Sequence, residues 1–215
     1  MCIRDRSLRA GINGPGSWGP VHTDATVPES PADALRDGRF TQVPVLVGTN
    51  LDEGRLFANE VKTMDRYRKE TIWMYGDEGQ RVLDRYPDGE DGPAYAIATN
   101  FTDQRFACPS QALRRVLSAH VPVWGYEFAD RQAPFVLPDW IVGLDLGAYH
   151  ASELAYVFGT SWVFADVKRF TPQQKALSDR MQRLWATFGT QAFAAEWPRV
   201  EGAGPVRVFA PVSYT

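Results

Sequence analysis

The chain has 215 residues, of which 44% are hydrophobic and 23% are charged, a balance typical of a globular protein with one or two folded domains. A formal net charge of −3 provides no basic surface for nucleic acid, so nucleic acid is not expected among its partners. No apolar run approaches the ~20 residues that cross a bilayer, and no apolar signal region follows the early arginines. Neither a membrane span nor a signal peptide is therefore predicted, and the compartment stays open.

The first residues do not have the pattern of a domain start. Residues 1–6 (MCIRDR) show neither periodicity nor a targeting signal, and we interpret them as a non-native stub. Residues 10–36 are rich in Gly, Pro, Ser and Asp, which indicates an irregular approach loop with one short helix at residues 32–36. The folded part is expected within residues 7–215.

A buried strand that ends in an acidic pair is the first candidate for chemistry. Residues 43–48 (VPVLVG) form an apolar run bounded by a glycine and a polar turn, as in a strand covered on both faces of a parallel sheet. Asp52 and Glu53 follow at its carboxyl end, where working groups of open α/β sheets collect. The alternative is an acidic helix start, which the helix dipole favours. The residues alone do not decide between these interpretations.

Helices and a second strand are predicted in the middle of the chain. The expected helical segments are one capped by Thr63, one opened by Asp77 or Glu78, one at residues 94–101 and one that starts at Pro109. Residues 121–128 (VPVWGYEF) are rich in aromatic and β-branched side chains and predict a strand of the same sheet.

His150 is the second candidate for chemistry. A short helix is predicted from Ser152, which leaves His150 on the loop just before it, where its ring can point into a crevice. An unperturbed imidazole titrates near pH ~6.5 and can take and return a proton at neutral pH. The alternative is a hydrogen-bonded packing residue, and we assign His22 and His120 to that structural class.

The last predicted helix begins at Thr171 and Pro172, a cap followed by a proline at the first helical position, and Gly189 is expected to end it. Its apolar residues fall on one stripe that should pack on a sheet face: Leu177, Met181, Leu184, Trp185 and Phe188. Residues 206–210 (VRVFA) indicate one more strand.

Several of these motifs, in this order, resemble the type-B carboxylesterase family, which includes cholinesterases and bacterial para-nitrobenzyl esterases. The motifs that carry the resemblance are VPVLVGTN (residues 43–50) with DEG (52–54), GAYHASEL (147–154) with VFG (157–159), FACPS (106–110) and VPVWGYEF (121–128). The resemblance implies an α/β fold, the C-terminal part of an α/β-hydrolase: a few sheet strands with packed helices, in an incomplete domain that occupies residues 7–215.

The resemblance also implies roles for particular residues. Glu53 would be the acid of a catalytic triad and His150 the general base, in the chain order of α/β-hydrolases, where the serine precedes both. Leu56, Phe57 and Phe135 would line the acyl pocket. The implied substrate is a small-molecule carboxylic ester, and neither a cofactor nor a metal is implied.

The nucleophile of such an enzyme is not found in this sequence. No G-x-S-x-G occurs, and the nearest string, PGSWG (residues 15–19), has proline where the first glycine belongs. No H-G-G-G-type oxyanion loop occurs either. Both features are expected upstream, so this chain alone is expected to be inactive and to expose a sheet edge. The alternatives are a non-catalytic binding or adhesion domain of the same family, and a complete small α/β domain.

Overall fold

Three parallel strands form the centre of the fold. They are β1 (Val45–Asn50), β2 (Val123–Phe128) and β3 (Arg207–Phe209), in the order β1-β2-β3. β1 and β2 are paired along their whole length. All three strands were predicted, and the observed bounds of the first are shifted by two residues because its pairing begins at the N–H of Val45.

The computed structural model describes residues 25–58, 61–89, 91–138, 142–191, 197–202 and 204–211. The interpreted stub and most of the approach loop lie outside these ranges. The helical elements are α2 (Pro31–Arg36), η1 (Glu53–Phe57), α3 (Met64–Tyr75), η2 (Gly76–Glu78), α4 (Gly79–Arg85), α5 (Pro93–Thr102), η3 (Asp103–Ala107), α6 (Cys108–Leu117), α8 (Glu153–Phe158), η4 (Val167–Arg169) and α9 (Pro172–Gln191).

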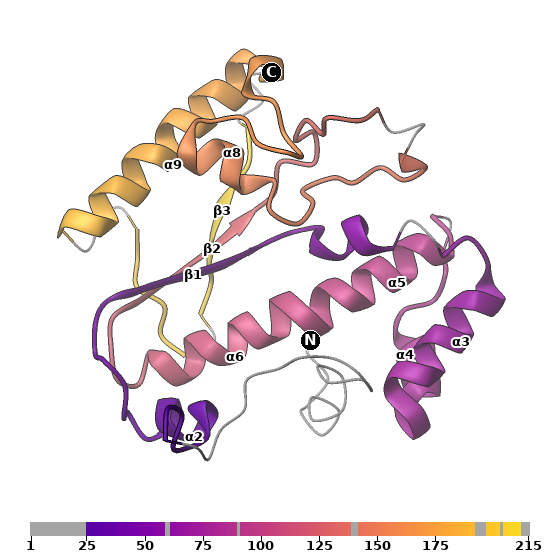
Figure 1. The fold of residues 1–215 in the computed structure, drawn as a ribbon, viewed down its shortest axis with the longest axis horizontal. Helices are drawn as coiled ribbons and strands as arrows, with labels where there is room; N and C mark the ends of the chain where they lie inside the picture. The colour runs from indigo at the N-terminus through magenta and orange to yellow at the C-terminus, as the bar shows by residue number, and fades with distance from the viewer. Residues whose placement is uncertain are drawn as a thin grey trace.

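Different helices cover the two faces of the sheet. Leu46 and Trp124 pack with residues of α8 and α9 in the main core, whereas Val45, Val47 and Val123 pack with residues of α2 and α6. Successive side chains of a strand point to opposite faces, so the apolar run of β1 supplies both cores. Figure 1 shows α9 on one side of the strands and α6 on the other. The sheet is thus the middle layer of an α/β arrangement.

The stripe of α9 packs as expected. Met181 is fully buried, and the Trp185 ring lies edge-on to Tyr126 of β2 at 5.0 Å between centroids. Phe188 meets Trp124 in the same way at 5.7 Å. The helix runs to Gln191, two residues beyond its predicted end at Gly189. That glycine faces open space and stays within the helix.

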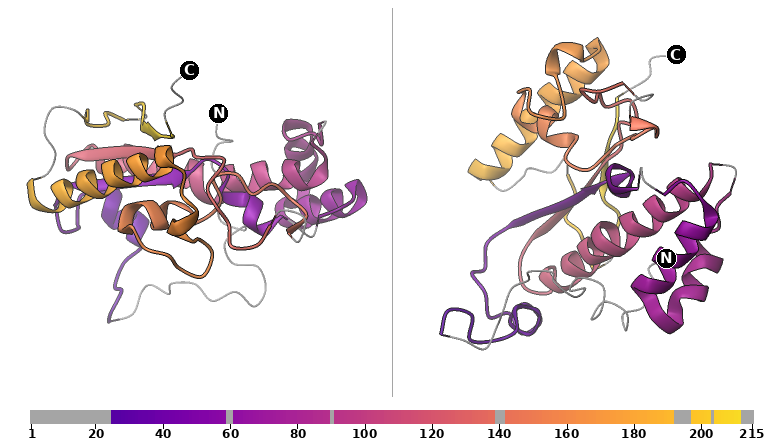
Figure 2. Two further views of the ribbon diagram at one scale, coloured as in Figure 1. Left: turned by 90° about the horizontal axis from the view of Figure 1, so that it is seen from above. Right: turned by 45° about the vertical axis from the view of Figure 1, so that its right-hand side comes forward.

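The predicted helices at residues 94–101 and after Pro109 are parts of one rod. The five-residue π-helical segment η3 joins α5 to α6 without a break in the helical path, as Figures 1 and 2 show. Pro109 lies in the first turn of α6, directly after the π-helical segment. Propensity and spacing do not reveal such a π-helical join, because it changes the backbone pairing and leaves the composition unchanged.

A smaller core lies between α3 and the α5 end of this rod. Tyr67 of α3 is fully buried there together with Ile97 of α5, and its hydroxyl donates a hydrogen bond to the backbone oxygen of Tyr86 at 2.6 Å. The side chain of Thr63 caps α3 by accepting from the N–H of Arg66, as predicted. Within the described ranges, no helix is both long enough and apolar enough to cross a membrane.

Candidate active site

Glu53 lies at the carboxyl end of β1, in the first position of η1. Its carboxylate folds back over the turn and accepts a hydrogen bond from the backbone N–H of Asn50 (N···Oε1 2.8 Å). The side chain is only 7% exposed, so the carboxylate meets its partners away from bulk water. The bond to Asn50 directs the second carboxylate oxygen away from the strand.

His150 is the partner of that second oxygen. The ring lies on the loop directly before α8, and its Nδ1 is 2.6 Å from Oε2 of Glu53. This hydrogen bond raises the pKa of His150 above its usual value, against the opposing effect of burial, and the negative charges of Glu53 and Glu153 act in the same direction. The His150 side chain is 42% exposed, and its Nε2 has no hydrogen-bond partner within the described part of the chain.

Two phenylalanine rings flank the imidazole. The centroid of Phe57 lies 5.4 Å from that of His150, and the centroid of Phe106 lies 5.1 Å away. Phe57 belongs to η1 and is 49% exposed, so an apolar surface borders the open side of the histidine. Phe106 comes from η3, and Phe101 of α5 packs against both phenylalanines.

Phe106 was not among the predicted pocket residues. It was recognised only as part of the FACPS motif, and nothing in its local pattern indicates which way its side chain points. The π-helical turn of η3 presents it toward His150, and π-helical turns of this kind are frequent at functional sites.

Glu153 places a second carboxylate near the pair. It accepts a hydrogen bond from the side-chain amide of Asn50, which also donates to the backbone oxygen of Tyr149 at 2.7 Å. Burial raises the pKa of Glu153 above its usual value, although the bond to Asn50 acts against this. Asn50 therefore connects the end of β1 to both sides of His150, and its role was not predicted.

Asp52, the other member of the predicted acidic pair, does not face His150. Its carboxylate accepts from the guanidinium groups of Arg55 and Arg131 and from the backbone N–H of Ala148. The residues alone left Asp52 and Glu53 equivalent, and the structure separates them: Glu53 contacts the imidazole, and Asp52 contacts the loop that carries it.

A sequence model of the carboxylesterase family matches residues 5–203. The chain belongs to the carboxylesterase family.

The carboxylesterase chain is similar to two curated relatives and to one solved structure. Fumonisin B1 esterase of Sphingopyxis macrogoltabida is 30% identical over 211 residues, which cover 91% of this chain and 37% of that protein. Para-nitrobenzyl esterase of Bacillus subtilis (strain 168) is 28% identical over 193 residues, 83% of this chain and 36% of that protein. A solved PNB esterase structure superposes with a TM-score of 0.63 at 24% identity, over 86% of this chain and 38% of its own.

These comparisons confirm the family resemblance and the fold class. The carboxylesterase chain has the fold of part of an α/β-hydrolase domain, with a small parallel sheet between helices. It spans less than two fifths of the length of these relatives.

The other two predicted pocket residues are Leu56 and Phe135. Leu56 is half-buried on η1. Phe135 packs edge-on against Tyr149 at 5.1 Å and stacks with Phe164 at 5.7 Å. It lines a polar hollow of about 420 Å³ together with Arg131 and Gly147, so the structure does not bring it to the imidazole.

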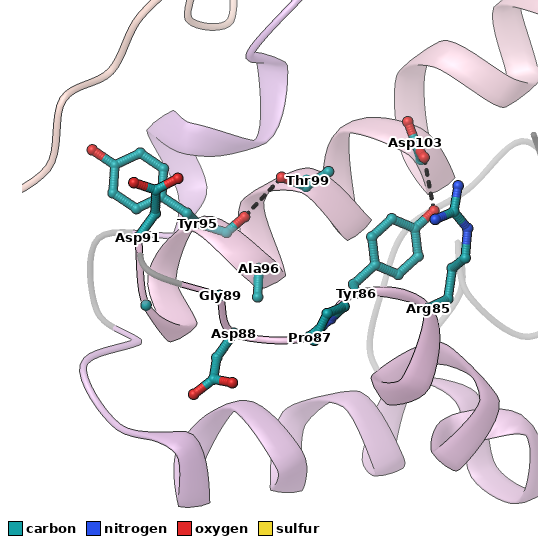
Figure 3. Close-up of a pocket in the computed structure, with 11 residues that line it drawn as sticks. Arg85, Tyr86, Pro87, Asp88, Gly89, Asp91, Tyr95, Ala96, Thr99 and Asp103 are labelled. Carbon is teal, nitrogen blue, oxygen red and sulfur yellow. Dashed lines mark hydrogen bonds between the residues drawn. The ribbon is translucent and has the colours of Figure 1, made fainter.

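A second hollow, of about 300 Å³, lies between α4 and α5 (Figure 3). Its lining is acidic and aromatic, and the hydroxyl of Tyr86 donates to Asp103 at 2.7 Å within it. Neither member of the acid–histidine pair reaches this hollow.

Of the two histidines assigned to structural roles, His120 lies within the described residues. His120 places Nε2 3.0 Å from the backbone oxygen of Arg36, and its ring lies edge-on to Phe40 at 5.9 Å. This is a packing contact between the end of α6 and α2. His22 lies outside the described residues.

Proposed function

We propose that this chain supplies the acid and the general base of a serine carboxylesterase. The observation that carries the proposal is the 2.6 Å contact between Nδ1 of His150 and the buried Glu53 at the carboxyl end of β1, with Nε2 left without a partner in the described residues. The serine and the oxyanion hole belong to a further part of the same domain, because this sequence has neither motif.

The geometry supports acyl transfer to a serine. With Nδ1–H donated to Glu53, the neutral imidazole keeps its lone pair on Nε2, which takes the proton of the serine hydroxyl as that oxygen attacks the ester carbonyl. The imidazolium then returns the proton to the leaving alcohol. In the second half, Nε2 takes a proton from water as that water attacks the acyl carbon, and the imidazolium returns the proton to the leaving serine oxygen. Glu53 holds the useful tautomer and stabilises the positive charge that His150 acquires in both halves.

We propose the phenylalanine cluster as a wall of the acyl pocket. Phe57 and Phe106 both contact the imidazole. The acyl group of a substrate that reacts with a serine beside His150 would therefore meet an apolar surface. Small carboxylic esters with an apolar acyl part are the substrate class that fits. Leu56 and Phe135 stay predictions as pocket residues.

The test is hydrolysis of para-nitrophenyl butyrate by the complete domain that contains this chain. We expect His150→Ala to lower kcat/KM by roughly 10³-fold or more and Glu53→Gln by a similar order, because the two act as one unit. Glu70→Gln, which removes an exposed carboxylate on α3, is the control and is expected to leave kcat/KM unchanged. Retention of activity in His150→Ala would contradict the proposed general base.

The isolated chain gives a complementary result. It is expected to show no hydrolysis above the buffer rate, because it has no G-x-S-x-G nucleophile. Turnover by the pure chain that is lost in His150→Ala would mean that a nucleophile lies within these residues, and the division of roles would be wrong.

A further inference from the structure

The loop that carries His150 is joined to the turn that carries Glu53 by a reciprocal pair of hydrogen bonds. The N–H of Asp52 donates to the backbone oxygen of Ala148 at 3.1 Å, and the N–H of Ala148 donates to Oδ2 of Asp52 at 3.0 Å. Asp52 is one residue before Glu53, and Ala148 is two residues before His150. The two catalytic side chains therefore extend from two backbone segments that Asp52 connects.

Two arginines hold the Asp52 carboxylate in place. Nη2 of Arg55 is 2.9 Å from Oδ1, and Nε of Arg131 is 3.1 Å from Oδ2. The side chains of Asp52 and Arg55 are 6% and 14% exposed, so the charge-assisted bond between them forms with little competition from water. The carboxylate has the charge partners that a buried anion requires, and they fix its direction toward Ala148.

The loop is shaped to receive this carboxylate. Gly147 has a φ of +58°, and a Cβ atom added there would lie 2.4 Å from Oδ2 of Asp52. Only glycine allows both the left-handed backbone and the close approach. The contact therefore depends on residues from both segments.

We propose that Asp52 is a positioning residue that sets the distance between Glu53 and His150. This inference rests on the proposed function of that pair. Asp52 touches neither the imidazole nor Glu53's carboxylate in any described hydrogen bond, and it acts by keeping the two backbone segments in register. Without its carboxylate, the turn keeps the backbone bond from the N–H of Asp52 to Ala148 but loses the bond that the N–H of Ala148 donates to Oδ2, and the Nδ1–Oε2 bond lengthens.

The test measures the protonation of His150 in the whole chain. Diethylpyrocarbonate modifies the neutral imidazole, and peptide mass spectrometry in dilute solution separates His150 from His22 and His120. The charged groups that face His150 are Glu53 and Glu153. In Asp52→Asn we expect the midpoint of the His150 modification profile to shift to lower pH, toward that of a free imidazole, because the bond that raises its pKa is weakened.

A second variant separates positioning from simple electrostatics. If charge alone mattered, removing the negative charge of Asp52 would lower the pKa of His150, and removing the positive charge of Arg131 would raise it. If Asp52 acts by positioning, both variants lower that pKa. Arg131 has a 58% exposed side chain, so Arg131→Gln is expected to keep the fold, and a melting temperature checks this. We expect Arg131→Gln also to shift the His150 midpoint downward. An upward shift, or none, would overturn the positioning role.

Asp130→Asn is the matched control for loss of a buried carboxylate. Asp130 is 2% exposed and accepts hydrogen bonds from Tyr156, Gln174 and the N–H of Gln132, none of which lies on the His150 loop. It is expected to lower the melting temperature and to leave the His150 midpoint unchanged. An equal shift of the His150 midpoint in Asp130→Asn and Asp52→Asn would contradict the positioning role and mean that Asp52 only stabilises the fold.

Glu53→Gln distinguishes failure of this inference from failure of the proposed function. If Glu53→Gln leaves the His150 midpoint unchanged, the acid–histidine pair itself is wrong. If Glu53→Gln shifts the midpoint downward and Asp52→Asn and Arg131→Gln do not, the pair stands and only the positioning role fails.

Discussion

At the residue scale, the backbone next to His150 is strained. Ala151 has a φ of +66°, and it is the one residue other than glycine with positive φ in the described ranges. For an alanine this left-handed conformation costs ~1–2 kcal/mol, because Cβ approaches the neighbouring carbonyl oxygen. Strain of this kind persists where the surrounding structure over-determines the backbone, and here it turns the chain from His150 into α8.

We expect Ala151→Gly to stabilise the chain by about 0.5–1 kcal/mol. Relief of the strain exceeds the ~0.5–1 kcal/mol of backbone entropy that glycine adds to the unfolded state. Ala186→Gly, in the exposed interior of α9, is the matched control and should destabilise by about 1 kcal/mol. Urea unfolding of both variants gives the comparison, and equal destabilisation would mean that residue 151 carries no strain.

The raised pKa of His150 predicts how stability depends on pH. A group whose folded-state pKa is raised stabilises the fold fully below its unfolded pKa, here 6.5, and the contribution is lost as the pH rises through the folded-state value. The wild type should therefore exceed Glu53→Gln in melting temperature by more at pH 6 than at pH 9. A difference that grows toward alkaline pH would contradict this ion pair.

At the scale of elements, η1 packs directly against α5. The N–H of Gly54 donates to the hydroxyl of Thr102 at 2.8 Å, and that hydroxyl donates in turn to the backbone oxygen of Ala98 at 2.9 Å. A Cβ atom on Gly54 would lie 2.0 Å from the same Ala98 oxygen. The absence of a side chain at Gly54 therefore lets the turn carrying Glu53 pack on the rod.

Gly54→Ala should destabilise the chain by about 1–3 kcal/mol, because η1 must move away from α5 to relieve the clash. Gly189→Ala, at a helical position that faces open space, should instead stabilise by about 0.5–1 kcal/mol. Thermal unfolding of the pair gives the contrast. If Gly54→Ala were as stable as Gly189→Ala, the close packing of η1 against α5 at Gly54 would be contradicted.

At the scale of the whole molecule, β1 has one paired edge and one open edge. The N–H groups of Val45 and Leu51 both donate to residues at the β2 side, so the alternation of a parallel ladder directs Val47 and Thr49 the same way. Leu46 and Gly48 then point to the opposite edge, where none of the described residues pairs with β1. Such an edge favours pairing with another strand.

Hydrogen exchange in dilute solution should distinguish the two edges. We expect the amides of Leu46 and Gly48 to exchange much faster than those of Val47 and Thr49, which donate to β2. At higher concentration the chain should self-associate, and protection should then extend to Leu46 and Gly48. Equal protection of all four amides in dilute solution would mean that the outer edge of β1 is already covered.

The sequence predicted the elements better than their contacts. The strands, the cap at Thr63, the proline start of α6 and the loop position of His150 depend on residues close together in the chain, and the structure has all of them. The end of α9 at Gly189 was wrong, and the π-helical join at η3 was not foreseen. Both concern backbone pairing, which composition does not report.

By itself, the sequence determined the family, the α/β class and the two segments that hold Glu53 and His150, because these depend on local pattern and on motifs in order. Only the tertiary structure decided that Glu53 meets the imidazole while Asp52 is paired with arginines, and that Phe106 borders the histidine while Phe135 does not. The physical reason is that a side chain's direction is set by the turn of its backbone and by hydrogen bonds to distant segments. Those partners lie as far as 97 positions away along the chain.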